Sequence, residues 1–347
     1  MAGERLWRID GVEVLAYYRR GQQDLPLIVF FPGGGHLARI AYGHAGADPR
    51  SFIDYWLEQA GYGLLALSYP GDHAVFSGRY PELTIGGWTE LAARIANDVV
   101  AAEGLSGVLT AMGWSMAGRF PAAFAAAARE RNMQVDCFVG LAASAPLPGL
   151  VPVRPQEPLT KDGLWDLFRP EADGAGRLPR WRSEISQALD SSGRPAVPAD
   201  AYDQHYVQAN PIGLRGERPK DASGNTEIDD SARAFSYAEF PWIASISPSG
   251  QSDARHALTD SAVWGAYNAQ KLYLAAAARL ARGAVPDERW SQIVTLARSL
   301  PSRLNRLVPG GHFFFFGAHE AHHVVQQVVE LQHEVTLLTR EIGILLE

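Results

Sequence analysis

The chain has 347 residues, enough for one large domain or two modest ones. Hydrophobic residues make up 47% and charged residues 20%, usual values for a soluble globular protein with a substantial core. The formal net charge is −7, from 31 basic and 38 acidic residues, so a basic surface for nucleic acid is not expected. The charged start MAGERLWRID lacks the apolar run of a secretory signal, and no uncharged apolar run reaches membrane-spanning length. We therefore expect a soluble cytoplasmic protein without a membrane span.

The first 145 residues alternate between strand patterns and helix patterns. Short runs rich in branched and aromatic residues predict strands, and longer runs with apolar residues at helical spacing predict helices. Strands are expected at 13–20, 25–31, 62–71, 107–114 and 135–144, with helices at 49–61, 88–104 and 117–131. Strands separated by helices favour a parallel sheet that is covered on both faces.

The composition changes between residues 146 and 238, where Pro, Gly, Asp, Ser and Arg become dense. A structureless loop of this length is improbable in a compact domain, so we predict helices joined by loops, inserted after a core strand. A cap over a pocket is preferred to a decorative or partly disordered insertion. If several of its aromatic residues face the pocket, they favour a largely apolar substrate; they are Trp165, Phe168, Trp181, Tyr202 and Tyr206.

From residue 239 to 347 the strand-and-helix rhythm resumes. Strands are expected at 241–247 and 303–308, and helices at 254–283, 287–300 and 318–346. The last helix is longer than the edge of a sheet requires. Its far end is therefore a candidate surface for a homodimer.

The stretch LTAMGWSMAGRF, residues 109–120, contains a candidate nucleophile. A serine hydroxyl needs a neighbouring base, and a tight turn between a strand and a helix presents it to a substrate. Crowding in such a turn requires small residues two positions before and after Ser115, and these are Gly113 and Ala117. Ala117 departs from the G-x-S-x-G pattern by one methyl group, and Gly118 follows it. Taken alone, this motif is weak.

Two glycine-rich turns follow other predicted strands. PGGGH at 32–36 offers backbone N–H groups that glycine allows to approach a developing oxyanion closely. It lacks both the Lys-Ser/Thr ending of a P-loop and the G-x-G-x-x-G spacing, which disfavours a phosphate-binding loop. PGGHF at 309–313 places His312 between the last short strand and the last helix. An imidazole there can accept the serine proton and return it to a leaving group.

The order strand–GGG, strand–GWSMAG–helix, insertion, strand–PGGHF–helix resembles the α/β-hydrolase family over residues 12–335. The resemblance implies an eight-stranded, mostly parallel sheet with helices on both faces, formed by residues 1–145 and 239–347. It also implies a largely helical cap formed by residues 146–238. Ser115 would be the nucleophile and His312 the general base. The oxyanion would be held by the backbone N–H groups of Gly34 and Met116, with Gly33 and Gly35 as alternatives to Gly34.

The acid that orients His312 is open among three aspartates. In this fold it usually follows the penultimate strand of the sheet, and PWIASISPSGQSD supplies a strand, a glycine and then Asp253. Because 59 residues separate Asp253 from His312, an extra helix must lie between them. Asp287 is nearer but follows a helical pattern, and Asp260 lies within a helix. We prefer Asp253.

These features predict a serine hydrolase that cleaves a small to medium, largely apolar carboxylic ester or thioester through an acyl-enzyme. Trp114, His36 and Phe313 are expected to line the substrate pocket. No cofactor or metal is expected, because a nucleotide fingerprint and zinc-spaced residues are both lacking, and the single cysteine, Cys137, lies in an apolar run. The alternatives are acyl transfer, lyase or cyclisation chemistry in secondary metabolism with the same triad, and a non-catalytic ligand-binding protein on this scaffold.

Overall fold

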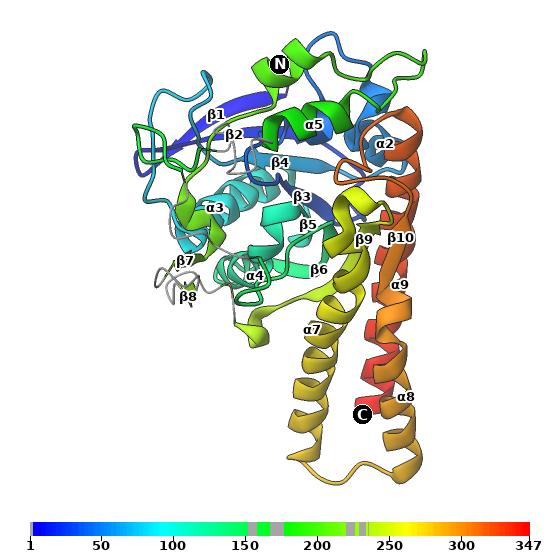
Figure 1. Cartoon of the computed structure of the whole chain (residues 1–347). Helices are drawn as coiled ribbons and strands as arrows, with labels where there is room; N and C mark the ends of the chain where they lie inside the picture. The colour runs from blue at the N-terminus through cyan, green and yellow to red at the C-terminus, as the bar shows by residue number, and fades with distance from the viewer. Residues whose placement is uncertain (1–2, 152–157, 167–176, 220–225, 229–233, 235) are drawn as a thin grey trace.

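The computed structural model describes residues 3–151, 158–166, 177–219, 226–228, 234 and 236–347. Its centre is an eight-stranded sheet with the strand order β1-β2-β4-β3-β5-β6-β9-β10 (Figure 1). The strands are β1 (Glu4–Ile9), β2 (Val12–Arg19), β3 (Leu27–Phe31), β4 (Leu64–Ser68), β5 (Val108–Trp114), β6 (Gln134–Leu141), β9 (Trp242–Pro248) and β10 (Asn305–Val308). Strand β2 runs antiparallel to β1 and β4, and the other neighbours are parallel. The predicted mostly parallel sheet of eight strands is confirmed.

Strand β1 is absent from the sequence-based prediction. Its residues are mostly exposed or half-buried, so they carry little of the apolar alternation that indicates a strand. The missed signal is the dipeptide Asp10-Gly11, whose φ angles are 50° and 82°. Two successive positive φ angles form the type I′ turn that Asp-Gly favours in a hairpin, here joining β1 to β2.

The two faces of the sheet carry separate hydrophobic cores, as strand β3 illustrates. Ile28 and Phe30 belong to one core, whereas Val29 and Phe31 belong to the other, because successive side chains of a strand point to opposite faces. Helices α2 and α9 contribute to the first core, and α3 and α4 to the second. Their bounds are α2 (Ile53–Gln59), α3 (Ile85–Glu103), α4 (Pro121–Arg129) and α9 (Ala318–Leu346). Helices therefore cover both faces, as predicted.

An arm of two helices, α7 (Ala254–Leu280) and α8 (Asp287–Leu304), projects away from the sheet (Figure 1). Both helices lie between Asp253 and His312 in the sequence. They account for the long separation of these two residues, which one helix alone would not fill.

The far end of α9 runs along this arm (Figure 1). Its apolar residues Leu338, Ile342 and Leu345 are buried within the chain, and Arg303 of α8 forms an ion pair with Glu341 of α9 at 2.6 Å. The sequence predicts a homodimer because this helix is longer than the edge of a sheet requires. Packing against the arm of the same chain accounts for the extra length, and the homodimer stays a prediction.

The described part of the segment 146–238 contains short elements that join the core. They are helices α5 (Arg177–Ile185) and α6 (Ala199–His205), the 3-10 helix η3 (Ile212–Arg215) and the two-stranded hairpin of β7 (Glu217–Pro219) and β8 (Thr226–Ile228). Trp181, Tyr202 and Tyr206 are buried in the core that also contains α2 and α9. Phe168 lies outside the described residues. Among the helices described, none combines the length and apolar character that crossing a bilayer requires.

Candidate active site

Ser115 lies on a sharp turn between β5 and a short 3-10 helix, η2 (Ser115–Arg119), which leads into α4. Its φ angle is 55°, a left-handed value that costs a residue with a side chain conformational energy. The carbonyl of Ser115 accepts a hydrogen bond of 2.7 Å from the N–H of Ser144, just beyond β6. The turn thus holds the serine in a strained conformation at the carboxyl end of a central strand.

Close packing around this turn explains its small residues. A Cβ atom added to Gly118 would lie 2.5 Å from the carbonyl oxygen of Ser144, and one added to Gly113 would lie 2.8 Å from the Phe138 ring. Ala117 is fully buried and carries its methyl group without disturbing the turn. The steric demand therefore falls on Gly113 and Gly118, and the departure from the glycine motif at position 117 is tolerated.

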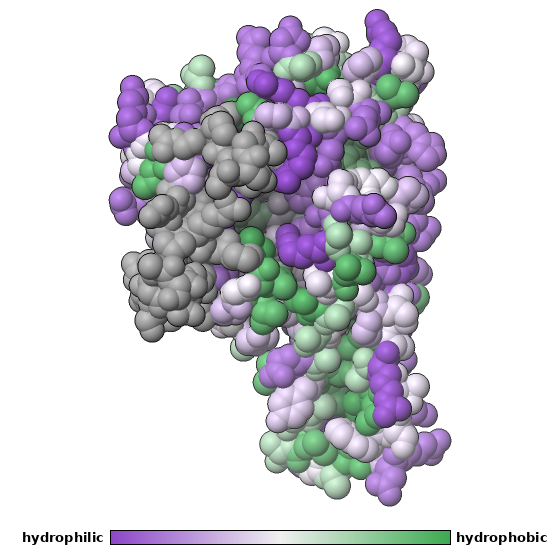
Figure 2. All heavy atoms as spheres, in the orientation of Figure 1, coloured by the Kyte–Doolittle hydropathy of each residue, from purple (hydrophilic) through white to green (hydrophobic). Residues whose placement is uncertain are grey.

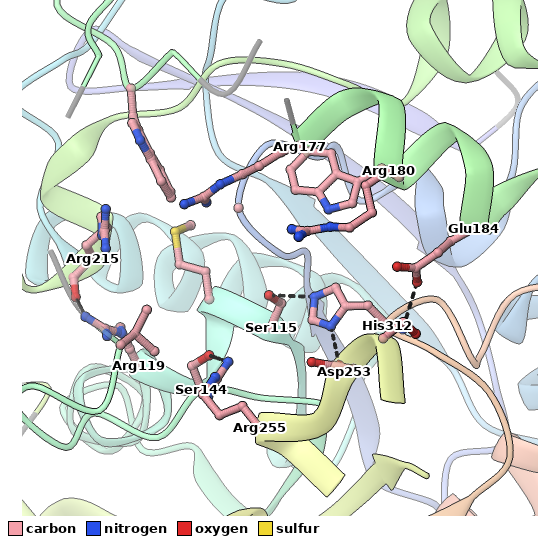
Figure 3. Close-up of a pocket in the computed structure, with 16 residues that line it drawn as sticks. Ser115, Arg119, Ser144, Arg177, Arg180, Glu184, Arg215, Asp253, Arg255 and His312 are labelled. Carbon is pink, nitrogen blue, oxygen red and sulfur yellow. Dashed lines mark hydrogen bonds and ion pairs between the residues drawn. The ribbon is translucent and has the colours of Figure 1, made fainter. Parts of the chain in front are cut away.

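His312 links Ser115 to Asp253 through hydrogen bonds (Figure 3). Its Nε2 lies 3.0 Å from Ser115 Oγ, and its Nδ1 lies 2.6 Å from Asp253 Oδ2. Asp253 ends the 3-10 helix η6 (Gln251–Asp253), which follows β9, and His312 follows β10. Parallel neighbours β9 and β10 bring both turns to the same edge of the sheet.

The loop that carries His312 is fixed by two further hydrogen bonds. The indole N–H of Trp114 donates to the His312 carbonyl at 3.1 Å, and the His312 N–H donates to Glu184 Oε2 at 3.0 Å. Glu184 belongs to α5, so the inserted segment contacts the loop of the histidine directly. Sequence reasoning missed Glu184, because a lone glutamate on a short helix carries no signal of this contact.

The other two candidate acids have different surroundings. Asp260 accepts a hydrogen bond of 2.7 Å from the Ser247 hydroxyl and lies 3.0 Å from His256 Nδ1. Asp287 is exposed at the start of α8. The structure therefore brings Asp253, and neither of the other two, to the ring of His312.

The charge of Asp253 depends on the histidine. Burial raises the pKa of this carboxyl, but the hydrogen bond and charge of His312, together with the charges of His256 and Arg255, lower it more, so the net shift is downward. Asp253 is therefore ionised at neutral pH and can stabilise a positive charge that forms on His312.

The three glycines of PGGGH differ in how their backbone groups are used. The Gly35 N–H donates to Asn210 Oδ1 at 3.0 Å, and the Gly33 carbonyl accepts from the Tyr69 hydroxyl at 2.7 Å. Gly34, with Met116, lines the cavity at Ser115. Asn210 lies 175 residues from Gly35 in the sequence, so its support of this loop was not predictable from local pattern.

His36 lies behind this loop rather than in the cavity. Its ring is fully buried, which lowers its pKa to about 3 and keeps it neutral. In the tautomer that satisfies both contacts, Nδ1–H donates to the Gly34 carbonyl at 3.0 Å and Nε2 accepts from the Tyr202 hydroxyl at 2.6 Å. Trp114 and Phe313 pack against the same ring. All three side chains are buried, and none of them is among the described residues that line the cavity at Ser115.

A cavity of about 240 Å³ opens at Ser115, between the sheet edge and α5 (Figure 3). Its described lining is strongly basic, unlike the apolar pocket that the aromatic residues of the insertion suggested. Trp165 and Trp181 do line it, whereas Tyr202 and Tyr206 do not. The arginines in the lining are Arg119, Arg177, Arg180, Arg215 and Arg255.

Asp253, His256 and His312 present possible metal-ligand atoms within 4.8 Å of one another. Each of these side chains already has a protein partner: both ring nitrogens of His312 and of His256 are engaged, and Asp253 is bonded to His312. The described donors are therefore satisfied without an ion. We therefore assign no metal to them.

No protein-family model and no curated protein matches this sequence. Among solved structures, the chain is similar to a putative aryl esterase from Burkholderia cenocepacia, with a TM-score of 0.51, 14% identity and coverage of 96% of this chain and 99% of the other. It is also similar to a soluble variant of the monoglyceride lipase from Saccharomyces cerevisiae, with a TM-score of 0.47, 12% identity and coverage of 97% and 94%. The first similarity, together with the strand order, shows that the chain has the α/β-hydrolase fold.

Proposed function

We propose that this protein is a serine hydrolase that cleaves a carboxylic ester or thioester through an acyl-enzyme on Ser115. The observation that carries the proposal is the line of hydrogen bonds from Asp253 through His312 to a serine on a strained turn. Nucleophile, base and orienting acid at these distances form the arrangement that acyl transfer requires. The α/β-hydrolase fold is consistent with this chemistry but does not by itself specify it.

In the first half of the reaction, Ser115 Oγ attacks the carbonyl carbon of the substrate while its proton passes to His312 Nε2. The electron pair of the C=O double bond moves to the oxygen, forming a tetrahedral intermediate. When that double bond forms again, the bond to the leaving oxygen or sulfur breaks. His312 then gives its proton to the departing alcohol or thiol, and the acyl group remains on Ser115.

In the second half, water repeats these steps. His312 takes a proton from the water, whose oxygen attacks the acyl carbon, and Ser115 leaves with that proton. The products are a carboxylic acid and the free enzyme. Asp253 accepts a hydrogen bond from the Nδ1–H group of His312 throughout. This bond keeps Nε2 available as a base and stabilises the imidazolium.

We assign the oxyanion hole to the backbone N–H groups of Gly34 and Met116. Both residues line the cavity beside Ser115, whereas the N–H of Gly35 is already bonded to Asn210. Fixed donors of this kind typically contribute about 3 kcal/mol each to the stabilisation of the transition state. The hydrogen bond between His36 and the Gly34 carbonyl supports the backbone that carries the Gly34 N–H group.

We further propose that residues 146–238 serve as a cap over the site. In support, α5 contributes Arg177, Arg180 and Glu184 to the lining of the cavity. The cap would restrict access of bulk water and contact the substrate, while residues 1–145 and 239–347 would form the core.

A serine-directed fluorophosphonate probe tests the nucleophile. We expect mass spectrometry to find the label on Ser115, and Ser115→Ala to remove both labelling and turnover of a p-nitrophenyl ester. Ser252→Ala is the matched control, because Ser252 also lines the cavity and has no hydrogen bond with His312 among the described residues. Labelling of a different serine, or undiminished turnover in Ser115→Ala, would refute the proposal. Release of free acid would separate hydrolysis from transfer, lyase or cyclisation outcomes.

A further inference from the structure

Arginine side chains surround the cavity beside Ser115 (Figure 3). Five arginines line it, and the carboxylates in its described lining are Glu184 and Asp253. Both carboxylates already accept hydrogen bonds from His312, one from its backbone and one from its ring. The described lining therefore contains more arginines than carboxylates, in a protein whose overall net charge is −7.

One of these arginines is neutralised within the protein. Arg119 is buried and forms an ion pair of 2.9 Å with Glu217, which is also buried. This pair accounts for Arg119 as part of the fold.

Arg180 and Arg255 retain unused donors. Arg180 has no hydrogen bond or ion pair with any described residue, and its side chain points toward Ser115 and His312 (Figure 3). Arg255 donates to Ser144 Oγ at 3.0 Å through Nη2, but its Nη1 is buried without a hydrogen-bond partner among the described residues. A buried guanidinium N–H without an acceptor is costly, so this cavity is suited to a ligand that supplies one.

Two of the arginines stack on Trp165, one of the two tryptophans in the described lining. The guanidinium carbons of Arg177 and Arg215 lie 4.7 and 4.5 Å from the centre of the Trp165 ring. Such stacking places the positive charge of both guanidinium groups over the Trp165 ring. An apolar substrate group would therefore meet charged groups at Trp165.

We infer that the substrate of this site carries an anionic group, a carboxylate or phosphate, that the arginine lining recognises, with Arg180 as its principal partner. The inference rests on the proposed function for calling the ligand a substrate. Guanidinium groups bind carboxylate and phosphate oxygens through paired, charge-assisted hydrogen bonds. The contact would orient the ester over Ser115, so it would determine specificity without taking part in bond breaking.

Two pairs of esters of matched size test the inference. The first pair is p-nitrophenyl pentanoate and the mono-p-nitrophenyl ester of glutaric acid, which differ by a carboxylate in the acyl part. The second pair is phenyl butyrate and 4-carboxyphenyl butyrate, which differ by a carboxylate in the alcohol part. We expect kcat/KM to be at least about tenfold higher for the charged member of one pair, as one charge-assisted hydrogen bond can provide. The preference should shrink as salt is raised, because the attraction is screened.

Arg180→Gln should lower that preference by about fivefold or more, measured as the ratio of kcat/KM values within the pair. Arg289→Gln, which removes an exposed arginine from the distant end of α8, is the control for net charge and should leave the ratio unchanged. If neutral esters are cleaved in a Ser115-dependent manner and neither pair shows a preference, the inference fails while the proposed function stands. If no ester is cleaved, the proposed function fails, and calorimetric binding of glutarate to Ser115→Ala decides the inference. If glutarate binds to Ser115→Ala and this binding is lost in Ser115→Ala/Arg180→Gln, the anion site is supported. If glutarate does not bind to Ser115→Ala, the inference is refuted.

Discussion

Replacing Asp253 by asparagine isolates the charge of the proposed triad acid. The side chain keeps its size, but His312 loses the carboxylate that lies 2.6 Å from its Nδ1. Opposite unit charges about 4 Å apart attract by about 4 kcal/mol at an effective dielectric constant of about 20, typical near a protein surface. Since about 1.4 kcal/mol corresponds to a factor of ten, kcat should fall roughly a thousandfold. An amide that donates to Nδ1 would also favour the wrong tautomer, which would deepen the loss.

The assay is kcat for a p-nitrophenyl ester at saturating substrate, with circular dichroism to verify folding. Asp287→Asn is the matched control, because Asp287 is exposed on the arm and should retain full activity. Asp260→Asn should mainly reduce stability, because its carboxylate is bonded to His256 and Ser247. A decrease of less than tenfold in Asp253→Asn, or an equal decrease in Asp287→Asn, would refute the assignment of the acid.

Three further predictions concern the surroundings of the site. His36 is neutral in the folded state, with a pKa lowered by burial to about 3 from an ordinary value of 6.5, so the unfolded chain binds a proton that the folded chain does not. The free energy of unfolding should therefore fall by up to about 1.4 kcal/mol per pH unit as the pH drops from 6.5 toward 3, and denaturant titrations should find a shallower dependence in His36→Gln. Glu217→Gln leaves the Arg119 guanidinium buried without its counter-charge and should lower the free energy of unfolding by about 3 kcal/mol, whereas Arg119→Met/Glu217→Leu should recover much of this loss in urea melts. Gly118→Ala forces a Cβ to within 2.5 Å of the Ser144 carbonyl oxygen and should slow probe labelling of Ser115 at least about tenfold, while Ala117→Gly should label normally.

The sheet and its covering helices were predictable because strong local patterns specify them. Strand β3, strand β5 and the second half of strand β6 are nearly continuous apolar runs, as strands covered on both faces must be. Ser115, His312 and Asp253 were identifiable because each follows a strand of the same sheet, so the topology alone places them at one edge. The long separation of Asp253 from His312 made the acid harder to assign from the sequence. The arm of α7 and α8, which leaves the sheet and returns to it, explains this separation.

The lining of the cavity was not predictable in the same way. Its arginines come from η2, α5, η3 and the start of α7, and their approach depends on how the inserted segment folds over the core. Aromatic residues in that segment suggested an apolar pocket, but an aromatic side chain in a sequence does not indicate which of its neighbours will stack on it. Trp165 lies beneath guanidinium groups, and Tyr202 faces His36 in the core.

The segment 146–238 contributes to the proposed site, because it supports both the glycine loop at 33–35 and the loop of His312. Asn210 holds the Gly35 N–H, Tyr202 holds His36 against the Gly34 carbonyl, and Glu184 holds the N–H of His312. Hydrogen bonds of this kind fix the groups that meet the transition state more closely than packing alone does. If the whole segment swung away to admit substrate, it would remove the support of Gly34 and His312 together. Access to the cavity should therefore come from movement of side chains such as Arg180 at its rim, while α6 and Asn210 stay in place.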